Sequence, residues 1–253
     1  GLAERAKLAS AQALALGRML LLPPDSNTVL KGELGTQKRV AWSEPAGLDP
    51  IKSACRRQGV KLNDLLVAAL TGALARFLEE HGRIDGLELR ALVPVYVRDA
   101  SAGDELENHF GLVYVSLPIA VRDRGERLRQ LHQSFESIKA QPDAVVALGV
   151  LGALGVASTE IEHIGIQLFT RKASVMITNV PGPPVEIHLT GSALSEMLVW
   201  APVSGQIGVG LSLLSYAGQV RLGVAADARR LPDPRVLVRF YEEELAALTS
   251  TAG

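Results

Sequence analysis

A short apolar stretch that runs into prolines constrains this chain more than any other feature. Residues 173–180 are mostly apolar and β-branched, which favours a buried strand. The strand should end at Pro181, because proline cannot donate to a strand ladder, and two more prolines follow Gly182, which is free to take a positive φ. Asn179 therefore either only ends a strand before a stiff turn or lines a binding site, and the pattern leaves both open.

Hydrophobic periods predict a series of further helices and strands. The predicted strands are 38–43, 87–98, 110–117, 185–189 and a hairpin over 207–224, and the predicted helices are 2–22, 49–59, 63–82, 128–138, 144–157, a helix opening at Thr159, and 233–248. This order is not a regular strand–helix–strand array. We therefore expect an α/β two-layer sandwich, with a mixed, mostly antiparallel sheet and helices mainly on one face.

Length and composition exclude several classes of protein. The 253 residues can bury a full core, and we expect a single domain over residues 1–253, with a helical packing segment at 1–24 and the α/β core at 25–253. The 26 basic and 27 acidic residues give no affinity for nucleic acid.

The single Cys55 and the lack of a signal peptide indicate the cytoplasm. The apolar run 144–157 is shorter than the about 20 residues of a membrane span.

The N-terminal segment leaves two interpretations open. Residues 2–22 combine many Ala and Leu with scattered charges, which suits either packing on a partner domain or lying on a membrane surface. Because the chain begins with Gly1, we expect it to be a piece of something longer.

Common catalytic motifs are missing, with one match that needs care. The sequence holds no phosphate-binding glycine loop, no GxSxG and no histidine or cysteine pair at metal-ligand spacing, so we expect no metal. His81 to Gly86 fits the pattern HxxxDG, in which the histidine would act as a base. Here, however, His81 ends a long helix before a polar turn. We interpret His81 as a chance match and as a cation at a helix C-terminus, so that no catalytic residue is expected in this chain.

Five short segments resemble, in order, the C-terminal half of bacterial wax ester synthase/diacylglycerol acyltransferases. They are Leu62–Ala68, Val93–Arg98, Glu107–Gly111, Thr178–Pro183, and Ser215–Gly218 with Pro232-Asp233. The resemblance covers nearly the whole chain. It implies the CoA-dependent acyltransferase fold, in which two similar α/β halves face each other across a tunnel.

The resemblance implies an O-acyltransferase that moves a fatty acyl group from acyl-CoA to diacylglycerol or a long-chain alcohol. Acyl-CoA would be a co-substrate, with no permanently bound cofactor. The family's base lies in an HHxxxDG motif of the N-terminal half, which this sequence lacks. This chain alone should thus be inactive, with the N-terminal half as its partner and with peripheral contact to membranes or lipid droplets. The alternative is a non-catalytic lipid-binding or docking module of the same fold.

The resemblance also points to particular residues. Asn179 is expected in the active site, with Thr178, Pro181 and Gly182 beside it in the tunnel wall. The family usually has serine where this chain has Thr178, so a hydroxyl is kept. It usually has serine also where this chain has Tyr96, and that added bulk leaves the size of the substrate open.

Other positions carry two interpretations each. Asn63 is expected as the N-cap of its helix with Asp64 in the first turn, or the pair fixes the tunnel wall or the CoA side. Arg98 and Asn108 are weaker candidates, since each also fits the end of a strand. Lys61 could meet a CoA phosphate or lie on a solvated face.

Overall fold

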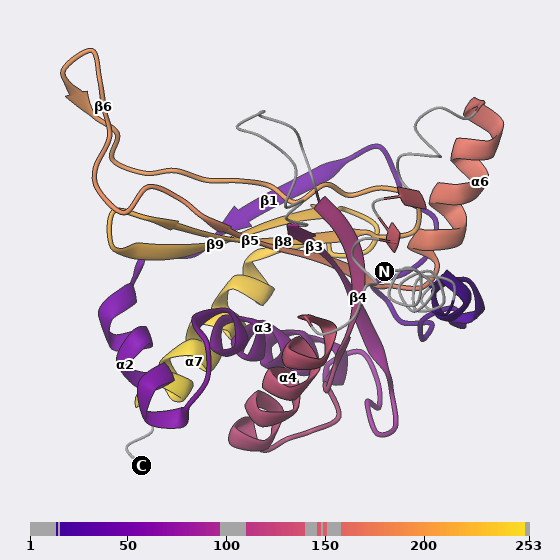
Figure 1. Ribbon diagram of the computed structural model, residues 1–253, viewed down its shortest axis with the longest axis horizontal. Coiled ribbons are helices and arrows are strands. Elements are labelled where there is room, and N and C mark those ends of the chain that lie inside the picture. Colours follow the sequence, from indigo (N-terminus) through magenta and orange to yellow (C-terminus); the bar gives the residue numbers. More distant parts are fainter. Residues whose placement is uncertain are drawn as a thin grey trace, which may run out of the picture.

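The computed structural model describes residues 14, 16–96, 110–139, 146–147, 149–150 and 158–250 (Figure 1). Its elements are β1 Lys38–Trp42, β2 Ala46–Gly47, α2 Leu48–Gln58, α3 Leu62–Glu79, β3 Leu89–Tyr96, β4 Phe110–Leu117, α4 Arg124–Lys139, α6 Thr159–Thr170, β5 Val175–Pro181, β6 His188–Leu189, β7 Ser192–Ala193, β8 Val209–Tyr216, β9 Gln219–Asp227 and α7 Arg235–Ser250. Residues 16–21 are also helical. Most of the predicted elements are therefore present within a few residues of their expected bounds.

The main sheet is mixed and mostly antiparallel, as predicted. Its strands lie in the order β1-β9-β8-β5-β3-β4, and β2 adds to β9. Strand β5 pairs in parallel with β8 and with β3, whereas the remaining pairs are antiparallel. Strands β8 and β9 form the expected hairpin, in which Ala217 and Gly218 take the positive φ values of 46° and 79° that a tight two-residue turn requires.

Helices α2, α3, α4 and α7 form one layer below the sheet, and α6 lies apart from them, on the other side (Figure 1). Helix α3 is the centre of that layer because its own Leu, Val and Ala side chains cover nearly all of its surface. Residues such as Leu70 and Leu74 are therefore at most 1% exposed. The sheet meets it with alternating apolar residues, including Leu211 and Leu213 of β8, both fully buried. This burial stabilises the two layers as one core.

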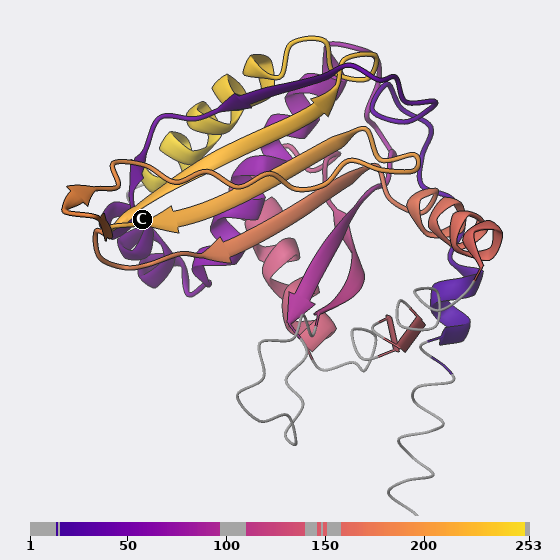
Figure 2. The ribbon, with the colours of Figure 1, turned by 90° about the horizontal axis from the view of Figure 1, so that it is seen from above.

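The opposite face of β8 and β9 is covered by an extended segment, residues 194–206, which crosses above the strands (Figure 2). Its backbone lies so close that a side chain at Gly210 would collide with the carbonyl oxygen of Ala201. Ser212 donates its hydroxyl to the carbonyl oxygen of Val199. Small residues on this face of β8 are therefore required by the segment above them.

Some predicted elements differ in the structure or lie outside it. The strand expected at 185–189 is only the two-residue β6, paired with β7 in a separate small sheet. Of the predicted helices 2–22 and 144–157, the structure describes only parts, and those parts are mainly helical. Within the described residues, no helix is long and apolar enough to cross a bilayer.

Candidate functional site

A groove opens where β3 and β5 separate. The two strands pair only at Ala91–Val175 and Leu92–Met176, after which β3 and β4 turn away from β5 (Figure 2). Pro94 lies just past the last of these pairs, where its missing N–H leaves no gap in a ladder with β5. The groove has a volume of about 470 Å³. It is lined by Lys61, Leu62, Asn63, Leu66, Val93, Pro94, Val95, Val113, Phe135, Ile138, Asn179, Pro181, Ser215 and Val220.

Two asparagines from distant parts of the sequence meet in this groove. Nδ2 of Asn179 donates to Oδ1 of Asn63 across 3.1 Å. Strand alternation places Asn179 on the same face of β5 as Val175 and Ile177, which is the face that α3 covers. Asn63 lies in the first turn of α3, directly across from the end of that strand. Two of the motifs that carry the resemblance thus form one polar pair in an otherwise largely apolar groove.

Asn63 is not the N-cap of α3, and that prediction was wrong. The helix begins at Leu62, with Lys61 as its extended N-cap residue. Oδ2 of Asp64 accepts the backbone N–H of Lys61 at 3.1 Å, so the carboxylate closes the first turn in place of a capping side chain. The Asn63 side chain is therefore not used to start the helix and is available to bond Asn179.

Asp64 lies between α3 and α4 and is not among the residues that line the groove. It is fully buried, and its Oδ2 lies 2.7 Å from Nδ1 of His132 on α4. The neighbouring residues Asn63 and Asp64 thus point to different surroundings. Lys61 does line the groove, and its ammonium group pairs with Glu136 at 2.7 Å.

The four predicted residues of β5 and its exit divide between the two faces of the strand. Asn179 and Pro181 line the groove, whereas the alternation turns Thr178 to the opposite face. Gly182 does not take a positive φ, so the conformational freedom expected from the sequence is not the reason for this glycine. A Cβ at Gly182 would instead collide with the carbonyl oxygen of Ser215, and the glycine permits β5 to approach β8 closely as it ends.

His81 lies far from the groove, at the other end of α3. The 18-residue helix separates it from Asn63 by roughly 27 Å. Nδ1–H of His81 donates to the carbonyl oxygen of Phe77 at 2.8 Å, and its ring packs on that of Phe77. This is the place expected for a residue at a helix C-terminus. Arg98 and Asn108, the two weaker candidates, lie outside the described residues.

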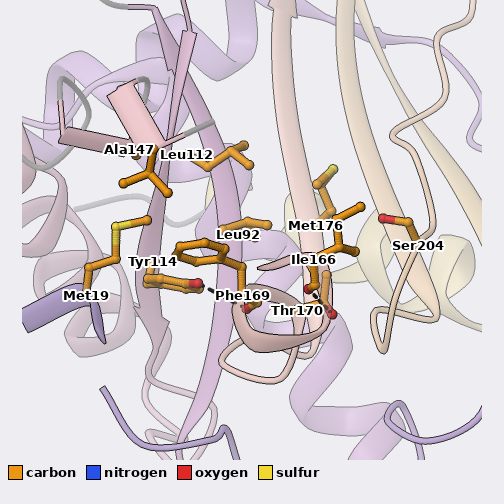
Figure 3. A pocket seen from close by; sticks show the side chains of 11 residues that line it. Met19, Leu92, Leu112, Tyr114, Ala147, Ile166, Phe169, Thr170, Met176 and Ser204 are labelled. Carbon is orange, nitrogen blue, oxygen red and sulfur yellow. Dashed lines mark hydrogen bonds between the residues drawn. The ribbon is translucent and has the colours of Figure 1, made fainter. Parts of the chain in front are cut away.

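A second, smaller cavity lies on the opposite face of the sheet, between β3, β4, β5 and α6 (Figure 3). Its volume is about 120 Å³. It is lined by Met19, Leu92, Leu112, Tyr114, Ala147, Val150, Ile166, Phe169, Thr170, Met176 and Ser204. Two of these residues, Ala147 and Val150, come from the apolar run 144–157.

The hydroxyl groups of two residues in this cavity are already bonded. The Tyr114 hydroxyl donates to the carbonyl oxygen of Phe169 at 3.0 Å (Figure 3). Burial raises the pKa of the Tyr114 phenol above its ordinary value, so it is a neutral donor at physiological pH. Thr170 donates to the carbonyl oxygen of Ile166 and accepts the N–H of Gln206. The cavity therefore suits an apolar group.

Among the residues that the structure describes, no group of three His, Cys, Asp or Glu side chains could hold a metal ion.

A family model described as the WS/DGAT C-terminal domain matches residues 106–249, more than half of the chain. The chain belongs to this family. The resemblance stated from the five motifs is thereby confirmed.

The proteins and structures that this chain resembles are longer than the chain itself. A putative diacylglycerol O-acyltransferase of Mycobacterium tuberculosis is 27% identical over 229 residues, which are 87% of this chain and 45% of that protein. The structure of a wax ester synthase/diacylglycerol acyltransferase from Marinobacter aquaeolei VT8 matches with a TM-score of 0.70 and 24% identity, covering 95% of this chain and 55% of that one. This chain spans about half the length of the curated relatives it matches.

The same fold occurs outside the WS/DGAT family. The trichothecene 15-O-acetyltransferase TRI3 of Fusarium sporotrichioides matches with a TM-score of 0.64 at 15% identity, over 97% of this chain and 53% of that one. At this identity the match shows the fold alone. The expected two-layer architecture, a mixed and mostly antiparallel sheet with helices mainly on one face, is thus confirmed.

Proposed function

We propose that this chain is the C-terminal half of an O-acyltransferase that moves a fatty acyl group from acyl-CoA to the hydroxyl of diacylglycerol or a long-chain alcohol. The product would be triacylglycerol or a wax ester. The observation that carries the proposal is the Asn63–Asn179 pair within the largely apolar groove. Membership of the WS/DGAT C-terminal domain family and the curated diacylglycerol O-acyltransferase relatives support it.

The Asn179 amide suits a role beside the reacting carbonyl. As the acceptor hydroxyl attacks the thioester carbon, its proton passes to a histidine base, and negative charge develops on the carbonyl oxygen. Collapse of this intermediate breaks the C–S bond, and the leaving CoA thiolate takes the proton from the histidine. Asn179 has two N–H donors, of which one is held by Asn63. The second N–H can stabilise the oxyanion, because the bond to Asn63 fixes the orientation of the amide.

The histidine base is expected in a preceding half of the protein. This sequence contains no HHxxxDG motif, and His81 is about a helix length away from the groove. That half would be the partner of this chain and would close the groove, so that the thioester reacts away from water.

Both cavities suit substrates with aliphatic chains. Leu66, Val93 and Phe135 line the groove, and the second cavity has mostly apolar walls with bonded hydroxyls. The two lie on opposite faces of the sheet. One aliphatic chain could therefore extend along each face.

We also propose that the protein is cytoplasmic and touches membranes or lipid inclusions peripherally. Exposed apolar side chains support this: Leu21 is 85% exposed, and Ile161 and Ile164 on the neighbouring α6 are 56% and 67% exposed. Flotation with phosphatidylcholine–diacylglycerol vesicles tests the proposal. Binding lost in a Leu21→Ser, Ile164→Ser variant supports it, and no flotation of the unchanged protein would reject it.

The second candidate is a lipid-binding module without catalysis, and the missing base favours it. Release of CoA thiol from palmitoyl-CoA, measured with and without diacylglycerol or hexadecanol, separates the two. The enzyme predicts acceptor-dependent release by the full-length protein and none by this chain alone. If the full-length protein binds these lipids yet releases no thiol with either acceptor, the module is correct.

A further inference from the structure

The start of α3, which carries Asn63, depends on one buried carboxylate. The N-cap residue is Lys61, whose side chain has no acceptor to offer the first helical N–H groups. Asp64 closes the turn instead, by accepting the N–H of Lys61. Because Asp64 is fully buried, the geometry of this turn requires its carboxylate to be held in place by further donors.

The further donor is His132 of α4. Its Nδ1 lies 2.7 Å from Oδ2 of Asp64, an oxygen that already accepts the N–H of Lys61, so the ring donates. The other oxygen, Oδ1, is buried without a hydrogen-bond partner in the described structure. Burial and then the charge of Asp64 raise the pKa of the Cys55 thiol, so this thiol stays neutral and brings no charge to the carboxylate. His132 is therefore the main side-chain support of Asp64.

The same helix that supports Asp64 also forms a wall of the groove. Phe135 and Ile138, one and nearly two turns after His132, line it beside α3. A second link between the helices, Lys61 to Glu136, is about half exposed at both ends and so contributes less. The His132–Asp64 pair joins the groove wall to the turn that carries Asn63.

We propose that His132 is a positioning residue for acyl transfer. Through Asp64 it holds the first turn of α3, so that Asn63 stays at 3.1 Å from Asn179 and fixes that amide. It touches neither substrate nor the reacting atoms. This inference rests on the proposed function for its effect on turnover, but the clamp on α3 is a structural claim that can be measured separately.

Three variants of the full-length protein test the clamp. His132→Leu removes the donor, whereas His132→Asn keeps an N–H close to the position of Nδ1. Glu136→Gln is the matched control, because it weakens the half-exposed link to Lys61 on the same helix and leaves His132 in place. Hydrogen exchange of the backbone amides at 62–66 is measured by mass spectrometry, and thiol release from palmitoyl-CoA is measured beside it.

We expect faster exchange at 62–66 and a several-fold fall in kcat for His132→Leu, at most the about tenfold loss expected for Asn63→Ala, with much of both restored in His132→Asn. Glu136→Gln should resemble the unchanged protein. In an Asn63→Ala background, His132→Leu should lower kcat by less than about twofold, because the residue through which it acts is gone.

Each contrary result has its own meaning. Unchanged exchange at 62–66 in His132→Leu overturns the clamp. Faster exchange with unchanged kcat, or the full loss of kcat again in the Asn63→Ala background, overturns the positioning role. If the unchanged protein releases no thiol, the proposed function fails, while hydrogen exchange still decides whether the clamp exists.

Discussion

Two polar regions along α3 differ in how completely their hydrogen bonds are made. Midway along the helix, Glu244 of α7 is 3% exposed, and both of its oxygens are bonded. Arg124 donates to them at 3.0 and 2.8 Å, and Arg127 donates at 3.0 Å. At the start of the helix, Asn63 and Asn179 share a single bond at the rim of an open groove. The closed cluster suits stability, and the open pair keeps hydrogen-bonding capacity for a ligand.

The closed cluster also explains a glycine in the middle of a helix. A side chain at Gly72 would come within 2.5 Å of both Arg127 and Glu244. Glycine in a helix costs about 1 kcal/mol relative to alanine. That cost is offset here because its absent side chain makes room for a buried ion pair.

The largest effect on stability is expected from Glu244→Gln. It removes the charge that Arg127 meets in the core, and breaking such a partly buried pair costs about 3 kcal/mol. For a chain of this size, the melting temperature should fall by roughly 6–12 °C. Acyl transfer per folded molecule should stay unchanged. A melting temperature within 2 °C of the original would show that the cluster does not stabilise the fold.

The same cluster predicts how acid affects stability. Burial alone would raise the pKa of Glu244, but the hydrogen bonds and charges of Arg124 and Arg127 outweigh it and hold the pKa below the ordinary value of a glutamate. A carboxyl group whose pKa is lower in the folded state than in the unfolded state stabilises the fold fully at pH values above its unfolded-state pKa. That stabilisation is lost as the pH falls through the folded-state pKa. Urea unfolding between pH 7 and pH 3 should thus show that the free energy of unfolding falls less steeply with pH in Glu244→Gln than in the unchanged protein. Equal slopes for both proteins would contradict this.

A smaller loss of stability is expected from Gly182→Ala, which tests the packing of β5 against β8 beside the open groove. Its methyl group would collide with the carbonyl oxygen of Ser215, and β5 and β8 would have to separate, at about 2 kcal/mol. Gly218→Ala is a useful comparison, because it adds backbone strain without any neighbour within 4 Å. If both variants lose the same stability and Gly182→Ala keeps full activity, close packing at Gly182 is not the reason for the glycine.

The smallest change in stability is expected from Asn63→Ala. Because Lys61 and Asp64 start the helix, the free energy of unfolding should change by less than about 0.5 kcal/mol, whereas loss of an N-cap costs about 1 kcal/mol. Turnover should nevertheless fall about tenfold, since Asn179 loses its partner. Asn63→Ser should lower turnover to the same extent. A large loss of stability with unchanged turnover per folded molecule would restore the capping account.

Much of this fold could be predicted from local patterns. The alternating strand 110–117 and the turn at Ala217-Gly218 depend on neighbours in sequence, and both are present as expected. The strand expected at 185–189 is reduced to the two-residue β6, and the segment 194–206 was not predicted, because both depend on contacts with other parts of the fold. Gly210 and Ser212 lie on the covered face of β8, but small residues in a strand do not show by themselves what covers them.

The candidate site was predictable only in part, for a similar reason. Motif resemblance selected both Asn63 and Asn179, yet nothing in the sequence shows that residues 116 positions apart share a hydrogen bond. An asparagine before a helix normally suggests a cap, and the competing carboxylate of Asp64 could not be weighed without geometry. His132 had no signal at all, since a lone histidine on an amphipathic helix is unremarkable in sequence.

The account depends most directly on the amide of Asn179. In the full-length protein, kcat for acceptor-dependent thiol release from palmitoyl-CoA should fall about 100-fold in Asn179→Ala, because an oxyanion donor is lost. The melting temperature should stay nearly constant, since Asn179 is exposed. Gln219→Ala, another exposed amide at a strand end, should match the unchanged protein. Turnover of Asn179→Ala within twofold of the unchanged protein would contradict the assignment of this groove as the acyl-transfer site.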